Sequence, residues 1–510
     1  MERFEPLMPE SKAIAKVLAS GYILDAKAFE MINKVPVGVD AEGLVDRLLE
    51  QKGGVVGEAK MITESDVARV MPEVTLQDKE DLRTLSSEPS ELEVVSDPTL
   101  AIAPAEASEG FNRLFRDRYQ RLYSILRNRL DTRGTVTVSA TKGLPLNKKV
   151  RVAGLLSDRS SRKGNVELKV DDPTGIMRAV CQDQLVEESA LKAPFDSMVV
   201  VEVSRGKTGQ LYASSVLLPD VPVRKPVSSS RRVYAVLLSD LHIGSKMFLA
   251  DDFGRFLQWI NGRMSDRDVV SRIKYMIIAG DLADGVGIYP GQEFQLAEKD
   301  PKNQYKMAAE LLKQVPSHIQ IVISPGNHDA VRQALPQPAV PIDLAESLYG
   351  MENVRWVGDP ASIKLNGVSF LVYHGKSLDD VIATTPDLTY DNPTAAMKLL
   401  LRSRHLSPTY GKRTALSPEL RDFMVIDQVP DVLHSGHVHT FGELSYRGTL
   451  LVNSGTWQGQ TDFQSNMGLE PTPSIIPVID LSTLEVLRRN FGAAGYEPYS
   501  KAVESVRTGP

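Results

Sequence analysis

The sequence predicts a mixed α/β protein (an α+β multidomain chain) built around more than one core, and three observations support this prediction. The chain has 510 residues, 42% of them hydrophobic, which indicates two to four domains. Residues 135–225 alternate apolar and polar side chains with the two-residue period of half-buried strands. Residues 231–495 contain five continuous apolar runs with room for helices between them, as in sheets buried on both faces.

Composition limits the cellular setting of the chain. The one cysteine, Cys181, excludes a disulfide framework and a cysteine-based zinc site, and it is typical of a reducing cytosol. No apolar run approaches the roughly 20 residues of a membrane helix. The first ten residues, MERFEPLMPE, lack the basic and apolar regions of a secretory signal. We therefore expect a cytoplasmic protein without a membrane partner.

The first 110 residues divide into a helical part and an acidic part. In residues 1–70 apolar side chains recur at helical spacing, which predicts a small helical N-terminal domain. The two apolar faces are Ala13, Ile14, Val17 and Leu18, and Leu44, Val45, Leu48 and Leu49. Residues 71–110 hold ten acidic and two basic residues and few large apolar ones. Such a composition does not offset the entropy of ordering, so we expect a flexible linker there.

The net charge of the chain depends on this acidic segment. The whole chain has 59 basic and 65 acidic residues, a net charge of −6, which by itself speaks against a nucleic-acid-binding protein. Residues 71–110 carry −8, so the other 470 residues carry +2. The remainder of the chain is therefore compatible with binding DNA.

Residues 111–134 are predicted to form a basic amphipathic helix. Apolar side chains recur there at steps of three and four residues, at Phe111, Phe115, Tyr119, Leu122, Leu126 and Leu130. Residues 111–133 contain seven Arg and two Asp, a net charge of +5. Three interpretations stay open: a solvated face, contact with phosphates, and packing against an acidic partner.

Residues 135–225 are predicted to form an OB-fold. Their pattern gives five short strands, with a polar helix-compatible stretch over residues 184–193 between the third and fourth strands. Positive charge comes from Lys148, Lys149, Arg151, Arg159, Arg162 and Lys163. The only aromatic residues are Phe195 and Tyr212, whereas single-strand binding uses aromatic stacking. A scaffold or partner-binding role is therefore favoured over capture of single-stranded DNA.

Each of the five apolar runs in residues 231–495 ends at residue types that bind metals. The runs are VYAVLLS before Asp240 and His242, YMIIAG before Asp281 and Asp284, IQIVISPG before Asn327 and His328, VSFLVY before His374, and DVLHSG before His437 and His439. In α/β sheets, ligands bind at the carboxyl ends of strands. Five such clusters in order are very hard to obtain by chance, so we expect a metal centre there.

The residue types in these clusters fit two divalent ions. A two-metal site needs one bridging carboxylate and three further ligands for each ion. Seven residues meet this need: Asp240, His242, Asp281, Asn327, His374, His437 and His439. Carboxylate, imidazole and amide oxygen suit Mn²⁺, Fe²⁺ or Zn²⁺ and make a purely oxygen-liganded Mg²⁺ site less favoured. Spacing alone therefore implies phosphoester hydrolysis, and Mn²⁺ is the metal that we expect first.

The motifs resemble a known superfamily. DLH, GDxxD, GNHD, HG and GHVH in this order are similar to the calcineurin-like metallophosphoesterases, which implies a β-sandwich flanked by helices. Four longer stretches resemble the small subunit of the archaeal family D replicative DNA polymerase. They are GVGIYPGQEFQL (285–296), GNHDAVRQALPQPA (326–339), RHLSPTYGKRTALSPE (404–419) and NSGTW (453–457). The order of helical region, acidic linker, OB-fold and phosphoesterase is also that family's.

The resemblance implies roles for the metal ligands. The first ion takes Asp240, His242, Asp281 and His439, and the second takes Asp281, Asn327, His374 and His437, so that Asp281 bridges. It also implies a 3′→5′ exonuclease that proofreads, a DNA substrate with a 3′ end, and a large partner subunit that polymerises DNA. A sliding clamp is a further candidate partner.

Two residues beside the ligands are candidates for acid–base chemistry. His328 is not needed as a ligand and follows Asn327, so it can face the leaving oxygen as general acid or transition-state stabiliser. Asp284 occupies the position at which related phosphatases place the carboxylate that holds this histidine. The alternative for Asp284 is an N-cap or turn residue in a glycine-rich loop.

Several residues are candidates for DNA contact. Arg402, Arg404, Lys412 and Arg413 surround TYG in a loop and fit either DNA phosphates or a subunit interface. Tyr289 fits stacking on a terminal base or simple loop packing. Of the other histidines, His434 is expected to be buried structure, and His405 and His318 to be on the surface. Trp457 is expected to pack beneath the site.

Three functions are consistent with the sequence. The leading one is an active nuclease subunit of a polymerase, because all seven ligands are present and nothing resembles a polymerase active site. The second is a non-catalytic scaffold subunit. The third is an independent repair nuclease or phosphodiesterase, against which the predicted OB-fold and N-terminal domain argue. Residues 496–510 are expected to be a C-terminal tail.

Overall fold

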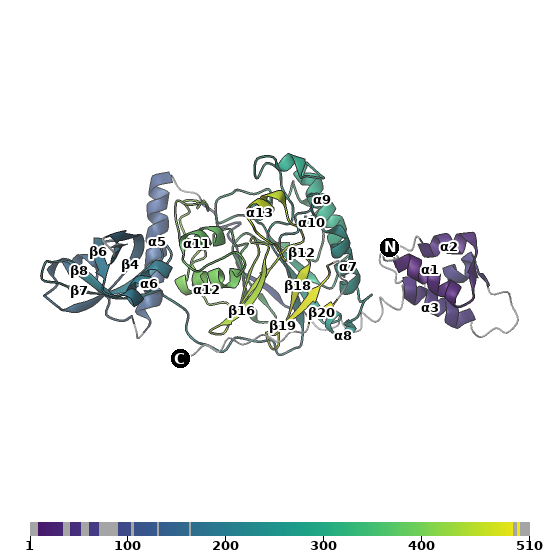
Figure 1. Cartoon of the computed structure of the whole chain (residues 1–510), viewed down its shortest axis with the longest axis horizontal. Helices are drawn as coiled ribbons and strands as arrows, with labels where there is room; N and C mark the ends of the chain where they lie inside the picture. The colour runs from purple at the N-terminus through teal and green to yellow at the C-terminus, as the bar shows by residue number, and fades with distance from the viewer. Residues whose placement is uncertain are drawn as a thin grey trace, which may run out of the picture. The chain divides into compact units, whose positions relative to one another are not determined.

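The computed structural model describes residues 9–33, 41–52, 61–70, 90–103, 107–129, 132–162, 165–492 and 497–499. Figure 1 shows the helices and strands along the chain. The chain divides into two compact units. The first contains residues 1–89, 253–274 and 314–318, and the second contains residues 90–252, 275–313 and 319–510. No helix within the described ranges is long and apolar enough to cross a membrane.

The described N-terminal part of the first unit contains helices and two short strands. It contains α1 (Pro9–Ala19), α2 (Ala26–Asn33), α3 (Ala41–Lys52), helical residues 64–70, and the paired parallel strands β1 (Ile23–Leu24) and β2 (Met61–Ile62). Val17, Leu44, Val45 and Leu48 lie in one buried cluster. Leu18 does not share this face and is 58% exposed. The unit also contains α8 (Arg267–Val270).

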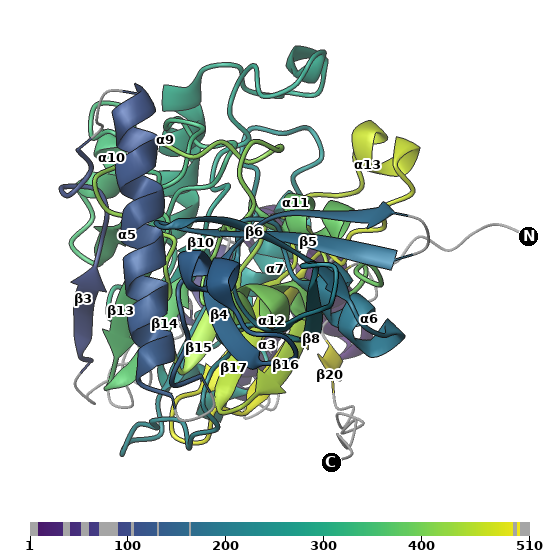
Figure 2. The same ribbon diagram turned by 90° about the vertical axis from the view of Figure 1, so that its left-hand side faces the viewer.

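The predicted linker over 71–110 is wrong for its described part. Strand β3 (Leu92–Ser96) pairs antiparallel with β13 (Ala361–Leu365), beside which it runs in Figure 2. Its Leu92 and Val94 pack against a core cluster, and this burial outweighs the acidic composition around them. Residues 71–89 lie outside the described residues.

The basic helix is present with shifted ends. Helix α5 (Ala107–Arg127) begins four residues before the predicted start at 111 and ends before 134. Its Leu122 and Leu126 pack with barrel residues in a buried cluster, and Figure 2 shows the full length of the helix. Two of its arginines bind an acidic segment of the same chain. Arg118 Nε lies 2.7 Å from Asp422 Oδ2, and Arg121 pairs with Asp427.

Residues 149–217 form a closed five-stranded barrel. The strands are β4 (Lys149–Arg162), β5 (Asn165–Asp172), β6 (Gly175–Cys181), β7 (Met198–Arg205) and β8 (Leu211–Leu217), paired in the order β4-β5-β6-β8-β7. A short 3₁₀ helix, η1 (Val138–Gly143), precedes β4, and α6 (Gln184–Lys192) lies between β6 and β7. This is the strand and helix order on which the OB-fold prediction depends.

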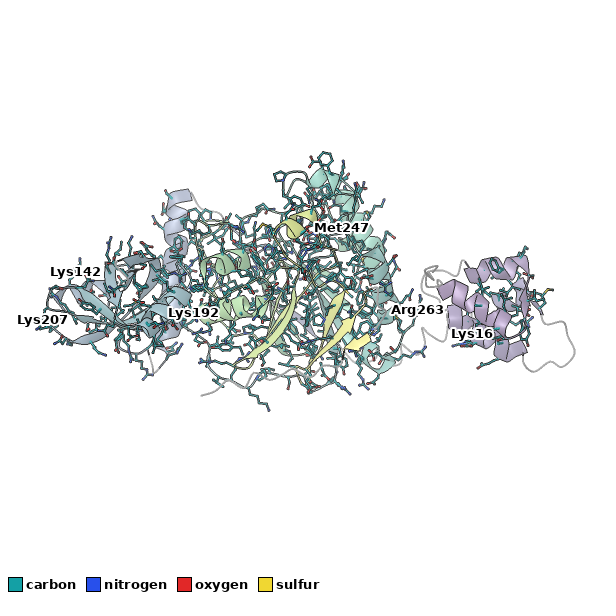
Figure 3. The ribbon with its side chains drawn as sticks, viewed as in Figure 1. Lys16, Lys142, Lys192, Lys207, Met247 and Arg263 are labelled. Atoms are coloured by element: carbon teal, nitrogen blue, oxygen red, sulfur yellow. The ribbon has the colours of Figure 1, made fainter. Side chains whose placement is uncertain are left out.

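Two of the predicted basic residues of the barrel are engaged by neighbours, and Lys163 lies outside the described residues. Arg159 lies over the ring of Phe195, 4.6 Å from its centroid, and donates to the carbonyl oxygens of Ala190, Ala193 and Thr384. Lys149 pairs with Glu202. Figure 3 labels Lys142, Lys192 and Lys207, which are exposed. Because Phe195 is already covered, the barrel offers little aromatic surface to single-stranded DNA.

Two sheets enclose the main core of the second unit. One has seven strands in the order β12-β11-β10-β9-β18-β19-β20, and the other has six in the order β16-β17-β15-β14-β13-β3. The remaining strands are β9 (Tyr234–Leu238), β10 (Ile273–Ala279), β11 (Gln320–Ser324), β12 (Val354–Trp356), β14 (Val368–Val372), β15 (Val432–Ser435), β16 (Phe441–Tyr446), β17 (Thr449–Ser454), β18 (Ile475–Asp480), β19 (Val486–Asn490) and β20 (Glu497–Tyr499). Strand β20 extends beyond the predicted end of the domain at 495.

The helices of this region complete the layers. They are η2 (Gln292–Phe294), α9 (Pro301–Leu312), α10 (Glu346–Tyr349), α11 (Leu378–Thr384), α12 (Pro393–Ser403) and α13 (Asp462–Asn466), whereas most of α7 (Ala250–Ile260) belongs to the first unit. Helices α11 and α12 pack on the six-stranded sheet, because Leu378 and Met397 share a buried cluster with Leu371 and Leu451. The predicted combination of strands and flanking helices is therefore confirmed at the level of a mixed α/β fold.

Candidate metal centre

The five strands predicted to end at metal-binding residues are all present and buried. Strands β9, β10 and β11 lie in the seven-stranded sheet, and β14 and β15 lie in the six-stranded sheet. Each is followed directly by its predicted cluster. The two sheets therefore bring together, at one place, side chains that are up to 199 positions apart in the chain.

Three predicted ligands of the first ion form a compact group. The Nε2 atoms of His242 and His439 are 3.0 Å apart, and Asp240 Oδ1 lies 3.4 Å from His439 Nε2 and 3.9 Å from His242 Nε2. Ligand atoms about 2.1 Å from one ion lie at such separations from each other. All three side chains are at least nine-tenths buried.

Three predicted ligands of the second ion are equally close. His374 Nε2 lies 3.0 Å from Asn327 Oδ1 and 3.3 Å from Asp281 Oδ2. The same Asp281 oxygen is 3.9 Å from His242 Nε2, so Asp281 faces both groups. His437 lies near this group, with its ring centroid 5.2 Å from that of His374. Its Nε2 faces Asp379 at 3.1 Å, which leaves Nδ1 as the atom for a metal.

The buried carboxylates of this cluster stabilise positive charge beside them. Burial alone would lower the pKa of His374, but Asp281 and Asp240 outweigh it and raise the pKa to about 10. Burial is likewise outweighed at His242, where Asp284 and the other carboxylates raise the pKa to about 9. Protons thus occupy the places where divalent ions would bind. Together with the donor set of carboxylates, imidazoles and an amide oxygen, this fits two divalent ions.

Hydrogen bonds on the outer side of the rings orient the ligands. His374 Nδ1 lies 2.9 Å from the carbonyl oxygen of Ala279. A carbonyl only accepts, so Nδ1 carries a proton, and Nε2 is the atom left to bind an ion once its own proton is displaced. His242 Nδ1 lies 2.8 Å from Asp284 Oδ1, and His439 Nδ1 lies 2.7 Å from the amide of Gln464. The atom of this amide that faces His439 is Nε2, and its Oε1 accepts from the backbone amide of Thr461.

The backbone at the ligands is strained. Asp240, His242, Asp281, His437 and His439 adopt the left-handed conformation, with φ of 53°, 51°, 52°, 72° and 59°. Such φ values are uncommon outside glycine and cluster at functional sites. The neighbouring glycines are required by space. A Cβ on Gly326 would lie 2.2 Å from Asp281 Oδ1, and one on Gly436 would lie 2.2 Å from Asp240 Oδ2.

His328 and Asp284 are in contact, but not through the predicted atoms. The carboxylate of Asp284 binds His242, and its Oδ1 is 3.6 Å from His328 Nδ1. His328 Nδ1 instead lies 2.8 Å from the backbone carbonyl oxygen of Asp284. Asp284 thus contacts His328 mainly through its backbone carbonyl, while its carboxylate hydrogen-bonds to His242. The carbonyl leaves His328 Nε2 as the atom that can exchange a proton in the cavity.

A cavity of about 260 Å³ opens over these residues. Tyr289 and Arg413, two of the predicted DNA-contact residues, lie in its wall. Lys412 is exposed outside the wall, and Arg402 pairs with Asp220 at 3.7 Å.

Arg404 is 4% exposed, and its guanidinium donates to the carbonyl oxygens of Ile426 and Asp427. Arg404 thus caps backbone carbonyls, and its predicted contact with DNA is wrong.

The remaining histidines divide into correct and incorrect predictions. His434 is fully buried as expected, and its Nε2 lies 3.0 Å from Ser454 Oγ. His405, predicted on the surface, is fully buried, 2.9 Å from Asp422 Oδ2, because the loop that carries it folds under α5. His318 is half-buried, and burial lowers its pKa to about 4.

Trp457 is 1% exposed, and its backbone amide donates to the carbonyl oxygen of Asp240, which agrees with its predicted place beneath the site.

The sequence did not predict several polar residues of the cavity wall, three of which contact predicted site residues. Asp379 faces His437, Gln464 faces His439, and Gln458 Nε2 lies 3.3 Å from Asp284 Oδ1. Asp379 lies in the first turn of α11, where acidic residues are ordinary, and both glutamines lie after β17. No spacing pattern separates them from surface residues, so only the three-dimensional contacts identify them.

Relatives of known name match most of the chain. Residues 235–443 match the family of B subunits of DNA polymerases alpha and epsilon. The DNA polymerase II small subunit of Archaeoglobus fulgidus is 37% identical over 485 residues, 93% of this chain and 97% of the relative. That of Halobacterium salinarum is 35% identical over 522 residues, 95% and 100% of the two chains. That of Pyrococcus furiosus is 39% identical over 386 residues, 74% and 63% of the two chains.

Solved structures give only distant similarity. An archaeal phosphodiesterase is 14% identical over 50% of this chain and 98% of its own, with a TM-score of 0.26. Zinc-bound Vps29 from Entamoeba histolytica is 13% identical over 52% and 96%, with a TM-score of 0.27. Similarity this low assigns no function, and the family is assigned from the sequence relatives. On that evidence, the chain belongs to the family of archaeal DNA polymerase II small subunits.

Proposed function

We propose that this chain is a 3′→5′ exonuclease that uses two divalent metal ions, Mn²⁺ first among them, within a two-subunit DNA polymerase. The observation that carries the proposal is the convergence of two buried carboxylates, an amide and three imidazoles, with ligand-like separations, beneath one cavity. Family membership supports DNA as the substrate. Divalent ions supply charge neutralisation at a phosphate and make water more acidic at such a site.

The proposed assignment of ligands follows the two groups. Asp240, His242 and His439 hold one ion, and Asn327, His374 and His437 hold the other. Asp281 is shared, which its position between His242 and His374 supports. In the reaction, water attacks the phosphorus of the terminal phosphodiester, and the bond to the 3′ oxygen of the preceding nucleotide breaks. The products are a nucleoside 5′-monophosphate and a strand that is one nucleotide shorter.

The other residues of the cavity handle the proton and the DNA. His328 is proposed to give a proton from Nε2 to the departing 3′ oxygen, while the Asp284 carbonyl holds its Nδ1–H. Arg413 is proposed to bind a phosphate, and Tyr289 to contact the terminal base.

Polymerisation is proposed to reside in a large partner subunit. The relatives are named small subunits, which supports such a partner for this chain. The barrel is proposed as an OB-fold that contacts the partner rather than DNA, because Arg159 covers Phe195 and pairs with backbone carbonyls. A sliding clamp is a further proposed partner.

A digestion experiment tests the activity. Single-stranded DNA labelled at the 3′ or the 5′ end is incubated with Mn²⁺ and the wild type, Asp281→Ala, or Asp387→Ala, whose carboxylate is exposed and pairs with Lys192. We expect immediate release of the 3′ label by the wild type and by Asp387→Ala only. Undiminished cleavage by Asp281→Ala would contradict the two-metal assignment. Absence of cleavage by the wild type, alone and with its partner, would favour a scaffold subunit.

A further inference from the structure

His437 is held in place at two points. Its backbone amide donates to the Asp240 carboxylate at 2.9 and 3.1 Å, in a left-handed backbone conformation with φ of 72°. Its ring packs at 76° to the ring of His374, 5.2 Å between centroids. The backbone contact fixes the position of the main chain at His437. Rotation about the side-chain bonds still decides which ring nitrogen faces the cluster.

The second point of attachment is Asp379. This residue lies in the first turn of α11, and its Oδ2 is 3.1 Å from His437 Nε2. Its other oxygen, Oδ1, accepts from the hydroxyl of Tyr390 at 3.0 Å. Both oxygens of the carboxylate are therefore engaged, and its direction is fixed. The side chains are 27% exposed for Asp379 and 13% for His437, so this is a mostly buried pair rather than a solvated one.

We propose that Asp379 is the positioning residue of His437 and thereby sets the affinity of the site for one of its two ions. An ionised carboxylate only accepts, so it keeps the proton on Nε2 and presents the lone pair of Nδ1 to the metal. The inference rests on the proposed role of His437 as a ligand. It extends to this histidine what Asp284 and the Ala279 carbonyl do for His242 and His374.

The same helix also joins this ligand to the wall of the cavity. The buried neighbour of Asp379, Asp380, accepts from the backbone amides of Arg413 and Thr414 at 2.8 and 2.9 Å. Tyr390 and Arg413 both line the cavity. Helix α11 therefore holds His437 through one carboxylate and the segment with Arg413 through the next. Because the two carboxylates have separate partners, loss of Asp379 should affect the metal and leave the position of Arg413 in place.

The test measures manganese binding with Asp379→Asn, which keeps the shape of the side chain and removes its charge. In calorimetric titration of the full chain, we expect two Mn²⁺ per wild-type molecule. For Asp379→Asn we expect one of the two dissociation constants to rise roughly 10–100-fold and the other to stay unchanged. Asp387→Asn is the matched exposed control and should bind as the wild type does. Asp379→Glu, which keeps the charge, should recover part of the loss.

A double mutant assigns the effect to His437. If Asp379 acts through this ring, adding Asp379→Asn to His437→Ala should cause no further loss of Mn²⁺ affinity. Circular dichroism confirms that each variant is folded. Wild-type affinity for both ions in Asp379→Asn would overturn the inference, even if DNA cleavage were observed. Conversely, two bound Mn²⁺ with the expected loss in Asp379→Asn, but no cleavage of DNA by the wild type, would support the inference and contradict the exonuclease.

Discussion

The carboxylates of Asp422 and Asp281 are both almost fully buried, but only the first is neutralised by a permanent cation of the protein. Arg118 Nε lies 2.7 Å from Asp422, and His405 Nε2 lies 2.9 Å away. Burial raises the pKa of Asp422, but His405 and Arg118 outweigh it and hold the pKa well below the usual value. Asp281, in contrast, is paired within the described part of the chain with histidines only.

The two clusters differ in access and backbone as well. The Asp422 cluster is closed between α5 and the loop after α12, and neither Arg118 nor His405 has a left-handed backbone. The cluster around Asp281 opens into a cavity and contains five strained ligand positions. A buried charged cluster that a permanent cation of the protein neutralises is structural. A cluster whose carboxylates are balanced only by displaceable protons on histidines, and which is open and strained, is suited to bind metal cations. Substitutions in each cluster should separate these two behaviours.

The largest expected effect is the loss of hydrolysis in Asp281→Asn. Removal of the shared carboxylate weakens both proposed ion sites, so the rate of DNA cleavage should fall on the order of 10³-fold or more. The metal-free protein should unfold at a lower temperature than the wild type, because the buried pairs of Asp281 with His242 and His374 are lost. Label release and thermal unfolding measure the two effects. A large drop in the unfolding temperature with normal cleavage would show that Asp281 has a structural role and is not a ligand needed for hydrolysis.

The matching change in the other cluster is Arg118→Ala. It leaves Asp422 buried without its cation and should lower the free energy of unfolding by about 3–5 kcal/mol. Denaturant titration measures this loss. The number of Mn²⁺ ions bound by the folded protein should stay at the wild-type value. Loss of Mn²⁺ by a folded Arg118→Ala protein would show that the two clusters are not independent.

His328→Ala should separate catalysis from metal binding. His328 contacts Asp281 through its backbone amide, at 2.7 Å, and this contact is unaffected by truncation of the side chain. Cleavage should fall roughly 10²-fold while both ions are retained. Calorimetry and label release on the same preparation provide the comparison. Loss of the ions would mean that His328 is a ligand and not the proton donor.

The pH dependence of Mn²⁺ binding should differ from that of folding. The pKa values of about 9 for His242 and about 10 for His374 lie above the unfolded value, so metal binding displaces protons and weakens as the pH falls. Affinity should change about tenfold per pH unit for each proton released. Calorimetry in buffers with different ionisation enthalpies measures the release. No release between pH 6 and 8 would contradict the raised values.

The pKa of His405 is shifted in the opposite direction, and the shift affects the pH dependence of folding rather than of metal binding. Burial and Arg118 lower its pKa to about 4, below the unfolded value, so it is neutral in the folded protein. Its contribution to stability is present above a pH of about 6.5 and is lost as the pH falls towards 4. The free energy of unfolding of the wild type, compared with His405→Gln over this range, measures that contribution. An identical acid profile in both proteins would contradict the assigned neutral state.

The smallest expected effect is that of Arg413→Ala. The side chain is exposed in the cavity wall, and one phosphate contact in solvent contributes little. KM for DNA should rise about three- to tenfold, with kcat nearly unchanged. Lys412→Ala, outside the wall, is the matched control and should change KM less. A fall in kcat alone would place Arg413 at the reacting phosphate rather than along the strand.

The same contrast explains which features can be predicted from sequence. The five metal-ligand clusters follow apolar strands, and strand ends meet at one edge by a general rule, so local patterns are enough to find the ligands. The Asp422 cluster joins Arg118 to a residue 304 positions away, and no local pattern marks that pair. The linker prediction over β3 is wrong for the same reason, because β3 pairs with the distant strand β13. His405 and Arg404 are buried against residues 17 to 23 positions away, again beyond the reach of a local pattern. Asp379 escapes prediction because its partner, His437, is 58 positions away.

The most direct test of the two-metal centre is a crystal structure of the chain with Mn²⁺, in which anomalous scattering at the manganese absorption edge locates the ions. We predict two peaks roughly 3.5–4 Å apart. Asp281 should lie between them, with Asp240, His242 and His439 around one and Asn327, His374 and His437 around the other. A single peak, or peaks away from Asp281, would contradict the two-metal centre.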